Sequence, residues 1–477
     1  MSDDPTVRDR LFISGEWVTP TEDDGLTDVI NAADGTVLGR VARGGQADVD
    51  WAVAAARRAF DTWSQTACEE RAGALEAVRD ALAARQEVAA RLISLEVGTP
   101  TLISQRVQVG LPLQTLQGYA DAARSYAWEE TIGNSVVLRE PAGVVGAITP
   151  WNYPLHQLVG KVGGALAAGC TVVAKPADVA PLSAFLLADA IAEAGLPPGV
   201  FNLVSGPGRR VGEALARQPG IDVLSFTGST EVGARVAALA AANITRVALE
   251  LGGKSASVVL DDADLPRAVK ASVNNAFLNS GQTCSAWTRL VVPRARQDEA
   301  LELARAAAAK LTLGHPLGGG TRLGPLASAA QQETVRQYIE IGRKEGATLV
   351  IGGPEQPEGL PDGFYVQPTI FGDVDRSSRI AQEEIFGPVL VVIPHDGDDD
   401  AVAIANDSSY GLTGGVWSAD EERALRVARR VRTGQIDLNG GRFNPAAPFG
   451  GYKKSGIGRE FGPFGIDEFV EVKAVQR

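Results

Sequence analysis

The stretch Asn279-Ser-Gly-Gln-Thr-Cys-Ser285 carries a cysteine, Cys284, among small and polar neighbours. A nucleophilic cysteine needs such a polar, accessible setting, because its thiolate must form and must reach its target. Cys170, inside Gly-Cys-Thr-Val-Val, and Cys68 fit a structural role better. No partner base stands near Cys284 in the sequence, so the stretch alone leaves it open between a nucleophile and a structural cysteine.

A second stretch, Ala248-Leu-Glu-Leu-Gly-Gly-Lys254, places Glu250 between apolar residues and just before a glycine pair. Burial would raise the pKa of this carboxyl group and make it a usable general base. A surface glutamate at the end of a strand, or an ion pair with Lys254, is equally compatible with the pattern.

A third stretch, Gly228-Ser-Thr-Glu-Val-Gly233, follows an apolar strand and opens a helix. Free amides and the positive end of the helix dipole suit a pyrophosphate at such a position. An ordinary capped turn has the same residues and remains the alternative.

Other familiar signatures are incomplete. The stretch Gly206–Gly212 resembles G-x-G-x-x-G but has Val211 at the last glycine, and a P-loop ending at Gly253-Lys-Ser would need a glycine where Ala248 stands. The three histidines lie far apart and without metal-ligand spacing, which favours core or surface roles over a metal site or a Ser-His triad. They are His156, His315 and His395.

Helices and strands must hold these stretches in place. From residue 143 onwards, predicted strands alternate with predicted helices along the chain. We expect strands at Val144–Thr149, Thr171–Ala174, Phe201–Val204 and Val223–Phe226, and helices at Leu155–Ala168, Leu182–Ala194, Val211–Arg217 and Glu231–Ala242. Continuous apolar strands that alternate with helices predict a buried parallel sheet, which binds ligands at the carboxyl ends of its strands. The loops Pro150–Pro154, Lys175–Asp178 and Gly228–Gly233 lie at those ends.

Further elements are expected on both sides of this series. The first residues should form strands at Leu11–Ile13 and Asp28–Ile30. A helix that begins at Ala47-Asp48 should have Trp51, Ala55 and Ala59 along one face. A second helix should cover Gln105–Trp128, and a strand should follow at Ser135–Pro141. A second α/β series comprises Ser257–Leu260, Leu265–Leu278, Leu290–Val292, a helix to Leu311, Leu349–Gly352 and Val389–Ile393.

Composition limits the classes of protein that fit. The chain has 477 residues, 45% of them hydrophobic, and a net charge of −13, which excludes a disordered chain and disfavours nucleic-acid binding. Three cysteines cannot form a disulfide framework, and the first residues lack the regions of a signal peptide. The longest apolar run, Val162–Ala174, is too short to span a bilayer. We expect a cytoplasmic protein without a nucleic-acid or membrane partner.

Seven motifs, taken in order, resemble those of the aldehyde dehydrogenase superfamily, in its NAD(P)-dependent, non-phosphorylating, hydrolytic form. They are Pro150–Pro154, Lys175-Pro176, Phe226–Thr230, Glu250–Lys254, Gly281–Cys284, Glu384–Pro388 and Pro448–Gly451. The resemblance covers nearly the full length, and it assigns a role to stretches that are ambiguous alone.

The resemblance implies three catalytic residues. Cys284 is the nucleophile that attacks the aldehyde carbon, and the oxyanion is held by the side-chain amide of Asn152 and the backbone N–H of Cys284. After hydride transfer leaves a thioester, Glu250 activates the water that hydrolyses it.

The resemblance also implies NAD as cofactor, with NADP as the alternative, and no metal. Lys175 binds the adenosine ribose, Ser229 the pyrophosphate and Glu384 the nicotinamide ribose, with Phe386 near the ring. Asp178 stands where many NAD-preferring relatives carry glutamate; a carboxylate there repels a 2′-phosphate. The set is completed by Gly228, Gly233, Ile148 and Trp151.

The implied fold is α/β, with a Rossmann-like cofactor domain, an α/β catalytic domain and a small β oligomerisation element. Residues 1–116 and 140–251 form the NAD-binding domain, residues 252–440 the catalytic domain, and residues 117–139 and 441–477 the oligomerisation element of a homodimer or homotetramer. The stretch Glu468-Phe-Val-Glu-Val could supply an edge strand that pairs with another subunit.

The resemblance implies a small-molecule aldehyde as substrate, and the tail around Asn444-Pro-Ala-Ala-Pro resembles that of a bacterial subgroup that oxidises semialdehydes or medium-chain aldehydes. Its entrance should be shaped by Gln105–Tyr119 and Gly440–Pro445. One alternative is a CoA-acylating semialdehyde dehydrogenase, whose relatives dispense with the glutamate found here at Glu250. The other is a non-catalytic binding protein on the same fold.

Overall fold

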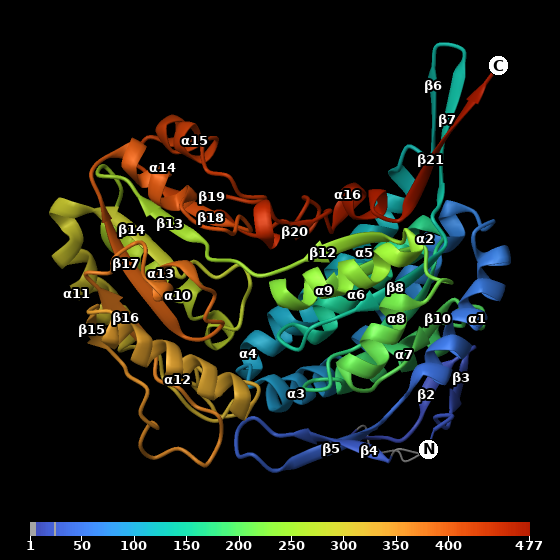
Figure 1. The fold of residues 1–477 in the computed structure, drawn as a ribbon, viewed down its shortest axis with the longest axis horizontal. Helices are drawn as coiled ribbons and strands as arrows, with labels where there is room; N and C mark the ends of the chain where they lie inside the picture. The colour runs from blue at the N-terminus through green and yellow to red at the C-terminus, as the bar shows by residue number, and fades with distance from the viewer. Residues whose placement is uncertain (1–5, 23–24) are drawn as a thin grey trace.

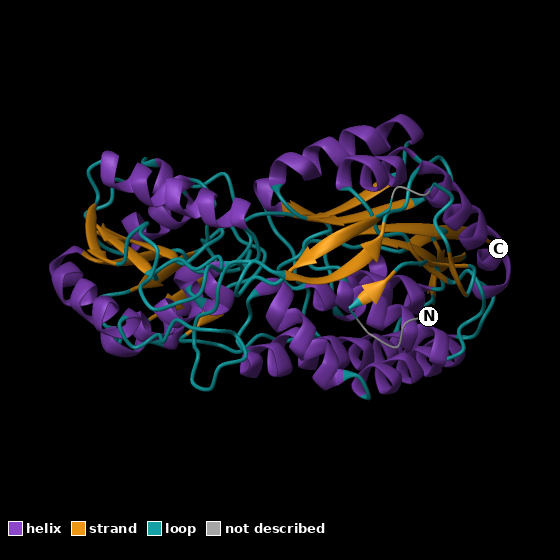
Figure 2. Cartoon of the chain, turned by 90° about the horizontal axis from the view of Figure 1, so that it is seen from below, coloured by secondary structure: helices purple, strands orange, loops and turns teal. Residues whose placement is uncertain are grey.

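The computed structural model describes residues 6–22 and 25–477. Two large β-sheets, each covered by helices, form two lobes, and a narrow three-stranded sheet projects from one of them (Figure 1). Turned by 90°, the molecule shows its strands in two groups with loops between them (Figure 2). The expected α/β architecture is confirmed.

The first sheet has eight strands in the order β20-β12-β11-β8-β9-β10-β2-β3. Its central strands are parallel: β8 (Val144–Ile148), β9 (Thr171–Lys175), β10 (Phe201–Leu203), β11 (Val223–Thr227) and β12 (Arg246–Glu250). The edge strands β2 (Leu11–Ile13), β3 (Glu16–Val18) and β20 (Gly456–Ile457) run antiparallel to their neighbours. Ile148 pairs with Lys175 and with Phe226, and Thr227 pairs with Glu250, so four carboxyl ends align at one edge.

Helices bury both faces of this sheet, which explains why its strands are continuously apolar. They include α1 (Gln46–Trp63), α2 (Cys68–Ala83), α3 (Gln86–Val97), α5 (Gly110–Ser125), α6 (Pro154–Ala168), α7 (Leu182–Glu193), α8 (Glu213–Arg217) and α9 (Thr230–Ala240). Every residue of α6 is buried. Helix α6 ends where expected, because Gly169 takes a left-handed conformation with φ 94°.

The second sheet has seven strands, of which only β15 is antiparallel to its neighbour. Their order is β15 (Thr348–Ile351), β16 (Thr369–Gly372), β17 (Val389–His395), β14 (Arg289–Pro293), β13 (Ala256–Val259), β18 (Gly414–Trp417) and β19 (Asp437–Leu438). The helices of this lobe are α10 (Leu265–Ala276), α11 (Gln297–Ala308), α12 (Ala329–Lys344), α13 (Arg379–Gln382), α14 (Asp398–Asn406) and α15 (Glu421–Ala428).

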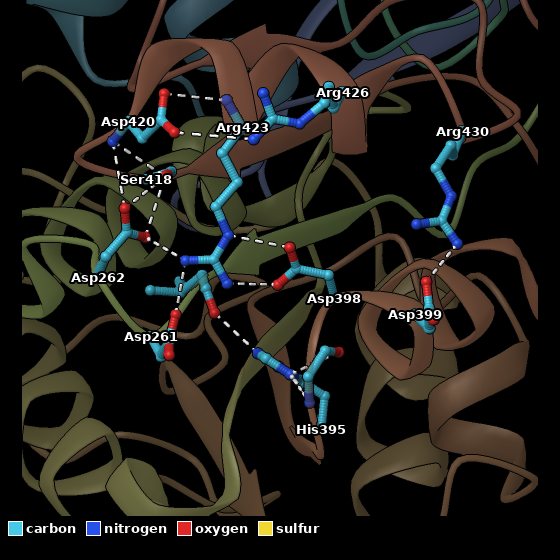
Figure 3. A network of polar contacts seen from close by, with 12 residues as sticks. Asp261, Asp262, His395, Asp398, Asp399, Ser418, Asp420, Arg423, Arg426 and Arg430 are labelled. Atoms are coloured by element: carbon cyan, nitrogen blue, oxygen red, sulfur yellow. Dashed lines mark hydrogen bonds and ion pairs between the residues drawn. The ribbon is translucent and has the colours of Figure 1, made fainter.

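An ion-pair network connects helices α14 and α15 of this lobe to the segment that follows β13 (Figure 3). Arg423 on α15 reaches Asp398 on α14 at 2.6 Å, and Asp261 at 2.7 Å and Asp262 at 3.2 Å beyond β13. His395 lies beside it, with Nε2 2.9 Å from the carbonyl of Val259. These contacts are structural, and they tie together segments that are distant in sequence.

The projecting sheet consists of β6 (Glu129–Ile132), β7 (Ser135–Pro141) and β21 (Val470–Gln476). Strand β7 lies between the other two and runs antiparallel to both, and β21 pairs with β7 over its full length. The expected C-terminal strand therefore exists, although it begins at Val470. A further small sheet near the N-terminus joins β1 (Val7–Arg8), β5 (Val37–Ala42) and β4 (Leu26–Ile30).

The structure corrects several expected elements. The helix predicted over Gln105–Trp128 is a π-helical stretch, Ser104–Val109, followed by α5, which ends at Ser125. A similar π-helical stretch, Gly208–Gly212, precedes α8. Trp51 does not share the buried face of Ala55 and Ala59, because its side chain is 39% exposed.

Within residues 6–22 and 25–477, no helix has both the length and the apolar content to cross a membrane. The boundaries expected for the cofactor, catalytic and oligomerisation domains remain predictions.

Candidate active site

The loop before Cys284 is held in a strained conformation. Asn279 and Ser280 take left-handed φ angles of 53° and 57°, which non-glycine residues rarely adopt. Thr99 Oγ1 donates to Asn279 Oδ1 at 2.5 Å, and Ser280 Oγ donates to the carbonyl of Gly324 at 2.8 Å. Gly281 follows with φ 74°, and a Cβ there would lie 2.1 Å from the carbonyl oxygen of Gly387. These contacts fix the loop that carries the cysteine.

Cys284 lies in the wall shared by two cavities and is partly exposed. Burial, with the charges of Glu384 and Glu250, raises the pKa of its thiol to about 12. The backbone N–H groups of Ser285 and Cys284 itself act against this rise. The thiol is therefore protonated at neutral pH in this structure, and its reaction as a thiolate requires a base or a nearby positive charge.

The other two cysteines have different surroundings. Cys170 is buried, and its Sγ donates to the carbonyl of Phe469 at 3.2 Å. Cys68 begins α2 and its Sγ donates to Glu69 at 2.8 Å. Neither cysteine lies in the wall of the two cavities that meet at Cys284.

Asn152 follows β8 and lies in the wall of the smaller of the two cavities, beside Cys284. Its Nδ2 donates to the carbonyl of Gln282 at 3.0 Å, and its own carbonyl accepts from Gln108 Nε2 at 2.8 Å and Asn279 Nδ2 at 3.0 Å. An amide nitrogen has two donors, so one hydrogen of Nδ2 remains for a ligand oxygen. The π-helical stretch Ser104–Val109 positions Gln108, which the sequence analysis did not single out.

Glu250 ends β12 and is 5% exposed. Desolvation raises the pKa of its carboxyl group, and the charge of Glu460 raises it further, while Lys161 and Arg459 lower it. The alternative of an ion pair with Lys254 is wrong: in the described chain, Glu250 Oε2 and Lys254 Nζ each have no hydrogen-bond partner. A buried carboxyl group of raised pKa is suited to accept a proton near neutral pH.

Lys161 and Glu460 form the polar cluster beside Glu250. Lys161 Nζ lies 2.7 Å from Glu460 Oε1 and donates to Ser225 Oγ at 3.1 Å. The sequence gives no sign of this cluster, because Lys161 stands inside the apolar helix α6 and Glu460 is far along the chain. Neither Glu250 nor this pair lies in the wall of the two cavities.

The smaller cavity, of about 250 Å³, lies at the carboxyl edge of the first sheet. Thr227 lies in its wall, and Thr227 Oγ1 is buried and has no hydrogen-bond partner among the described residues. Ser229 caps α9 by accepting from the N–H of Val232 at 3.3 Å. The wall consists of Pro150, Trp151, Asn152, Thr227, Gly228, Ser229, Leu251, Gly252, Cys284, Gln331, Thr334, Glu384, Ile385 and Phe386.

Two groups in this wall suit a ribosyl nicotinamide. Glu384 Oε1 accepts from the N–H of Gly253 at 2.9 Å, and burial raises the pKa of this carboxyl group to about 7. The rings of Trp151 and Phe386 meet edge to face, with centroids 5.4 Å apart. A carboxylate that accepts from hydroxyl groups, beside aromatic rings and a helix N-terminus, fits one end of a dinucleotide.

Four of the predicted cofactor residues lie outside this cavity wall. Lys175, the last residue of β9, pairs with Asp178 at 3.2 Å. Gly233 lets α9 approach Leu251, since a Cβ there would lie 2.4 Å from Leu251 Cδ2. Ile148 is buried in the core at the end of β8. In this structure Gly233 and Ile148 have packing roles.

The larger cavity, of about 520 Å³, has a largely aromatic wall. The rings of Phe443, Phe449 and Phe461 lie within 6.2 Å of one another, and His156 stacks on Phe461 with centroids 5.2 Å apart. Burial lowers the pKa of His156 to about 4, so its imidazole is neutral. The two segments expected at the entrance contribute Arg106, Val107, Leu111, Gly440, Gly441 and Phe443.

The sequence analysis missed most of this wall. Phe449 falls inside the motif Pro448–Gly451, but nothing assigned its side chain a place. Phe461, Trp287 and Tyr153 come from separate segments, and only folding brings them together. As for metals, no group of three or more His, Cys, Asp or Glu able to hold an ion occurs in residues 6–22 and 25–477.

The fold and the site together define an α/β enzyme of the dehydrogenase class. The model of the aldehyde dehydrogenase family matches residues 17–475. The 3-succinoylsemialdehyde-pyridine dehydrogenase of a Pseudomonas species is 48% identical over 472 residues, which cover 98% of each chain. This chain therefore belongs to the aldehyde dehydrogenase family, as the motifs predicted.

Solved structures agree with this assignment. A mutant of aldehyde dehydrogenase C from Pseudomonas syringae, complexed with NAD+ and octanal, has a TM-score of 0.98 and 47% identity, covering 99% of this chain and 97% of that one. An aldehyde dehydrogenase of Mycobacterium tuberculosis complexed with NAD+ has a TM-score of 0.97 and 44% identity, covering 99% and 98%.

Proposed function

We propose that this protein oxidises an aldehyde to the carboxylic acid with NAD+, through a thioester on Cys284. The observation that carries the proposal is the position of Cys284 in the wall between two cavities of different character. One cavity has the sheet edge, helix N-terminus and carboxylate that suit a dinucleotide. The other has the aromatic wall that suits an organic aldehyde.

The reaction begins when the Cys284 thiolate adds to the carbonyl carbon and turns the carbonyl oxygen into an alkoxide. Asn152 Nδ2 and the Cys284 backbone N–H hold this oxygen, where negative charge develops. NAD+, when bound, supplies the acceptor for the hydride that leaves the aldehyde carbon. Loss of that hydride re-forms the carbonyl as a thioester to Cys284.

Hydrolysis of the thioester requires an activated water, and we assign its activation to Glu250. The carboxylate accepts the proton as water adds to the thioester carbon, and the Cys284 sulfur leaves. Burial and the raised pKa suit Glu250 to this role. The presence of this base favours hydrolysis over transfer of the acyl group to CoA. The cysteine and the amide that lie together in one cavity wall disfavour a non-catalytic protein.

For the cofactor we propose NAD over NADP. Asp178 and its partner Lys175 lie at the carboxyl end of β9, where the adenosine ribose is expected. A carboxylate at this position disfavours a 2′-phosphate by charge repulsion. Both related structures named above contain NAD+.

For the substrate we propose a medium-chain aldehyde or a semialdehyde with an apolar body, as the aromatic wall suggests. The related Pseudomonas syringae protein was solved with octanal, and the related Pseudomonas enzyme is named for a pyridine-bearing semialdehyde.

We further propose a homodimer or homotetramer that works in the cytoplasm. Within the described chain, β21 pairs with β7 on one side only, and Ile132, Val472 and Val475 are exposed on this projecting sheet. Such an edge can pair with a second copy of the chain. The three free thiols suit a reducing compartment.

An assay of NADH formation over a panel of aldehydes, with and without CoA, tests the proposed activity. We expect turnover without CoA and a carboxylic acid as the product. Turnover that depends on CoA would support the acylating alternative, and no NADH with any aldehyde would support a non-catalytic protein.

A further inference from the structure

The charged side chains in the wall of the larger cavity differ in how far they are buried. The titratable side chains there are Arg106, Tyr153, His156, Cys284 and Asp437. Burial keeps His156 neutral and raises the pKa of Tyr153 well above its usual value. At neutral pH the permanent charges of this wall are therefore those of Arg106 and Asp437.

Asp437 lies on β19 and is partly buried, and burial raises the pKa of its carboxyl group. Its Oδ1 accepts from Gln435 Nε2 at 3.2 Å. Within residues 6–22 and 25–477, burial and this hydrogen bond are the influences on its pKa, and no charge of a Lys, Arg or His acts on it. A partly desolvated carboxylate without a counter-ion is stabilised by any cation that binds beside it.

Arg106 has the opposite surroundings. It lies on the π-helical stretch Ser104–Val109 with an exposed side chain, and it also lines an open surface groove with residues such as Glu87 and Gln105. Water and salt screen a charge in this position, so it attracts an anion only weakly.

The rest of the wall also favours a positive group. Gln157 Oε1 is buried and has no hydrogen-bond partner among the described residues, which leaves a carbonyl dipole unmatched. The faces of Phe443, Phe449 and Phe461 carry negative potential and attract cations. Asp437 is the one full negative charge among these features.

We propose that Asp437 makes this cavity select aldehydes that carry a positive charge at the end remote from the carbonyl, over aldehydes that carry a carboxylate there. The inference rests on the proposed function and deepens it, because it names a substrate class for the same site. Asp437 acts on binding and takes no part in the chemical steps at Cys284.

The test uses three aldehydes with the same three-methylene spacer: 4-(trimethylammonio)butanal, its neutral isostere 5,5-dimethylhexanal, and 5-oxopentanoate. We expect the wild type to have a higher kcat/KM for the cation than for the carboxylate. Asp437→Asn should lower this ratio about tenfold, mainly through KM for the cation, and should change kcat/KM for the neutral aldehyde less than about threefold. The control Arg106→Gln should change the ratio less than about threefold.

An unchanged ratio in Asp437→Asn, or a wild-type preference for the carboxylate, would overturn the inference. If the wild type oxidised 5,5-dimethylhexanal but had equal kcat/KM for the cationic and the carboxylate aldehyde, the inference about Asp437 would be wrong. The proposed function would still hold. Calorimetric binding of the butyltrimethylammonium ion needs no turnover and should weaken about tenfold in Asp437→Asn. Equal binding by both proteins would overturn the inference even if no aldehyde were oxidised.

Discussion

The two cavities that meet at Cys284 are built in opposite ways. The smaller one is formed by short segments at the ends of adjacent parallel strands, such as Pro150–Asn152 and Thr227–Ser229. The larger one is formed by single side chains from elements far apart in the chain, such as Leu111, Trp287 and Phe461. A sheet edge produces contiguous motifs, whereas a wall of side chains from distant elements leaves most of its residues outside any motif. Five predictions test this division.

The largest effect is expected from Cys284→Ala, which removes the sulfur between the two cavities. NADH formation should fall about 10⁴-fold or more, because no other group in the wall can form the thioester. NAD+ binding, measured by calorimetry, should persist, since the smaller cavity keeps its other residues. Cys68→Ala is the matched control and should keep wild-type activity. Near wild-type turnover by Cys284→Ala would refute the assigned nucleophile.

Glu250→Gln should separate the two chemical halves, because Glu250 is assigned to the hydrolysis that follows hydride transfer. The amide cannot accept a proton from water, so the steady rate should fall about 10²–10⁴-fold. A rapid burst of NADH should precede it, with an acyl group on Cys284 visible by intact-protein mass spectrometry. If no burst and no adduct were found at any pH, Glu250 would have to act before hydride transfer.

Asn152→Ala removes a donor from the wall of the smaller cavity. We expect kcat to fall about 10²–10³-fold, because the oxyanion loses one of its two hydrogen bonds. KM for NAD+ should change little if the amide serves the reacting oxygen alone. A raised KM for NAD+ with an unchanged kcat would instead assign Asn152 to the cofactor.

The pH dependence of Cys284 alkylation tests its surroundings. With a pKa of about 12, the thiolate fraction should rise about tenfold for each pH unit between 7 and 9. Iodoacetamide labelling without cofactor, followed by peptide mass spectrometry, should show the same rise. A plateau below pH 8 would mean that the pKa of the thiol is not raised.

The smallest effects should come from one substitution at the expected adenosine site and one in the wall of the larger cavity. Asp178→Ser should improve kcat/KM for NADP relative to NAD about three- to tenfold, because the repulsive charge is removed, and should leave KM for the aldehyde unchanged. Phe443→Ala should do the reverse, raising KM for a medium-chain aldehyde several-fold through lost apolar contact. Equal responses of both KM values in either variant would contradict the division between the cavities.

Regular elements could be predicted from the sequence where a repeated pattern has one physical cause. The strands at Val144–Ile148 and Thr171–Lys175 were expected almost to the residue, because a sheet buried on both faces requires continuous apolar runs. The π-helical stretch Ser104–Val109 was missed, since the apolar spacing of a helix does not show where one extra residue widens a turn. Trp51 was misplaced because helical spacing does not say which face a neighbouring element covers.

The sequence by itself determined the family and the stretches that carry its motifs, and through the family it named Cys284, Asn152 and Glu250 as candidates, because each motif is a short stretch that is contiguous in the chain. Only the tertiary structure placed Cys284 between two cavities and surrounded Glu250 with Lys161 and Glu460. It alone left Asp437 without a counter-ion in the described chain. The physical reason is that burial, charge and pKa depend on neighbours from distant segments, and packing decides which segments meet.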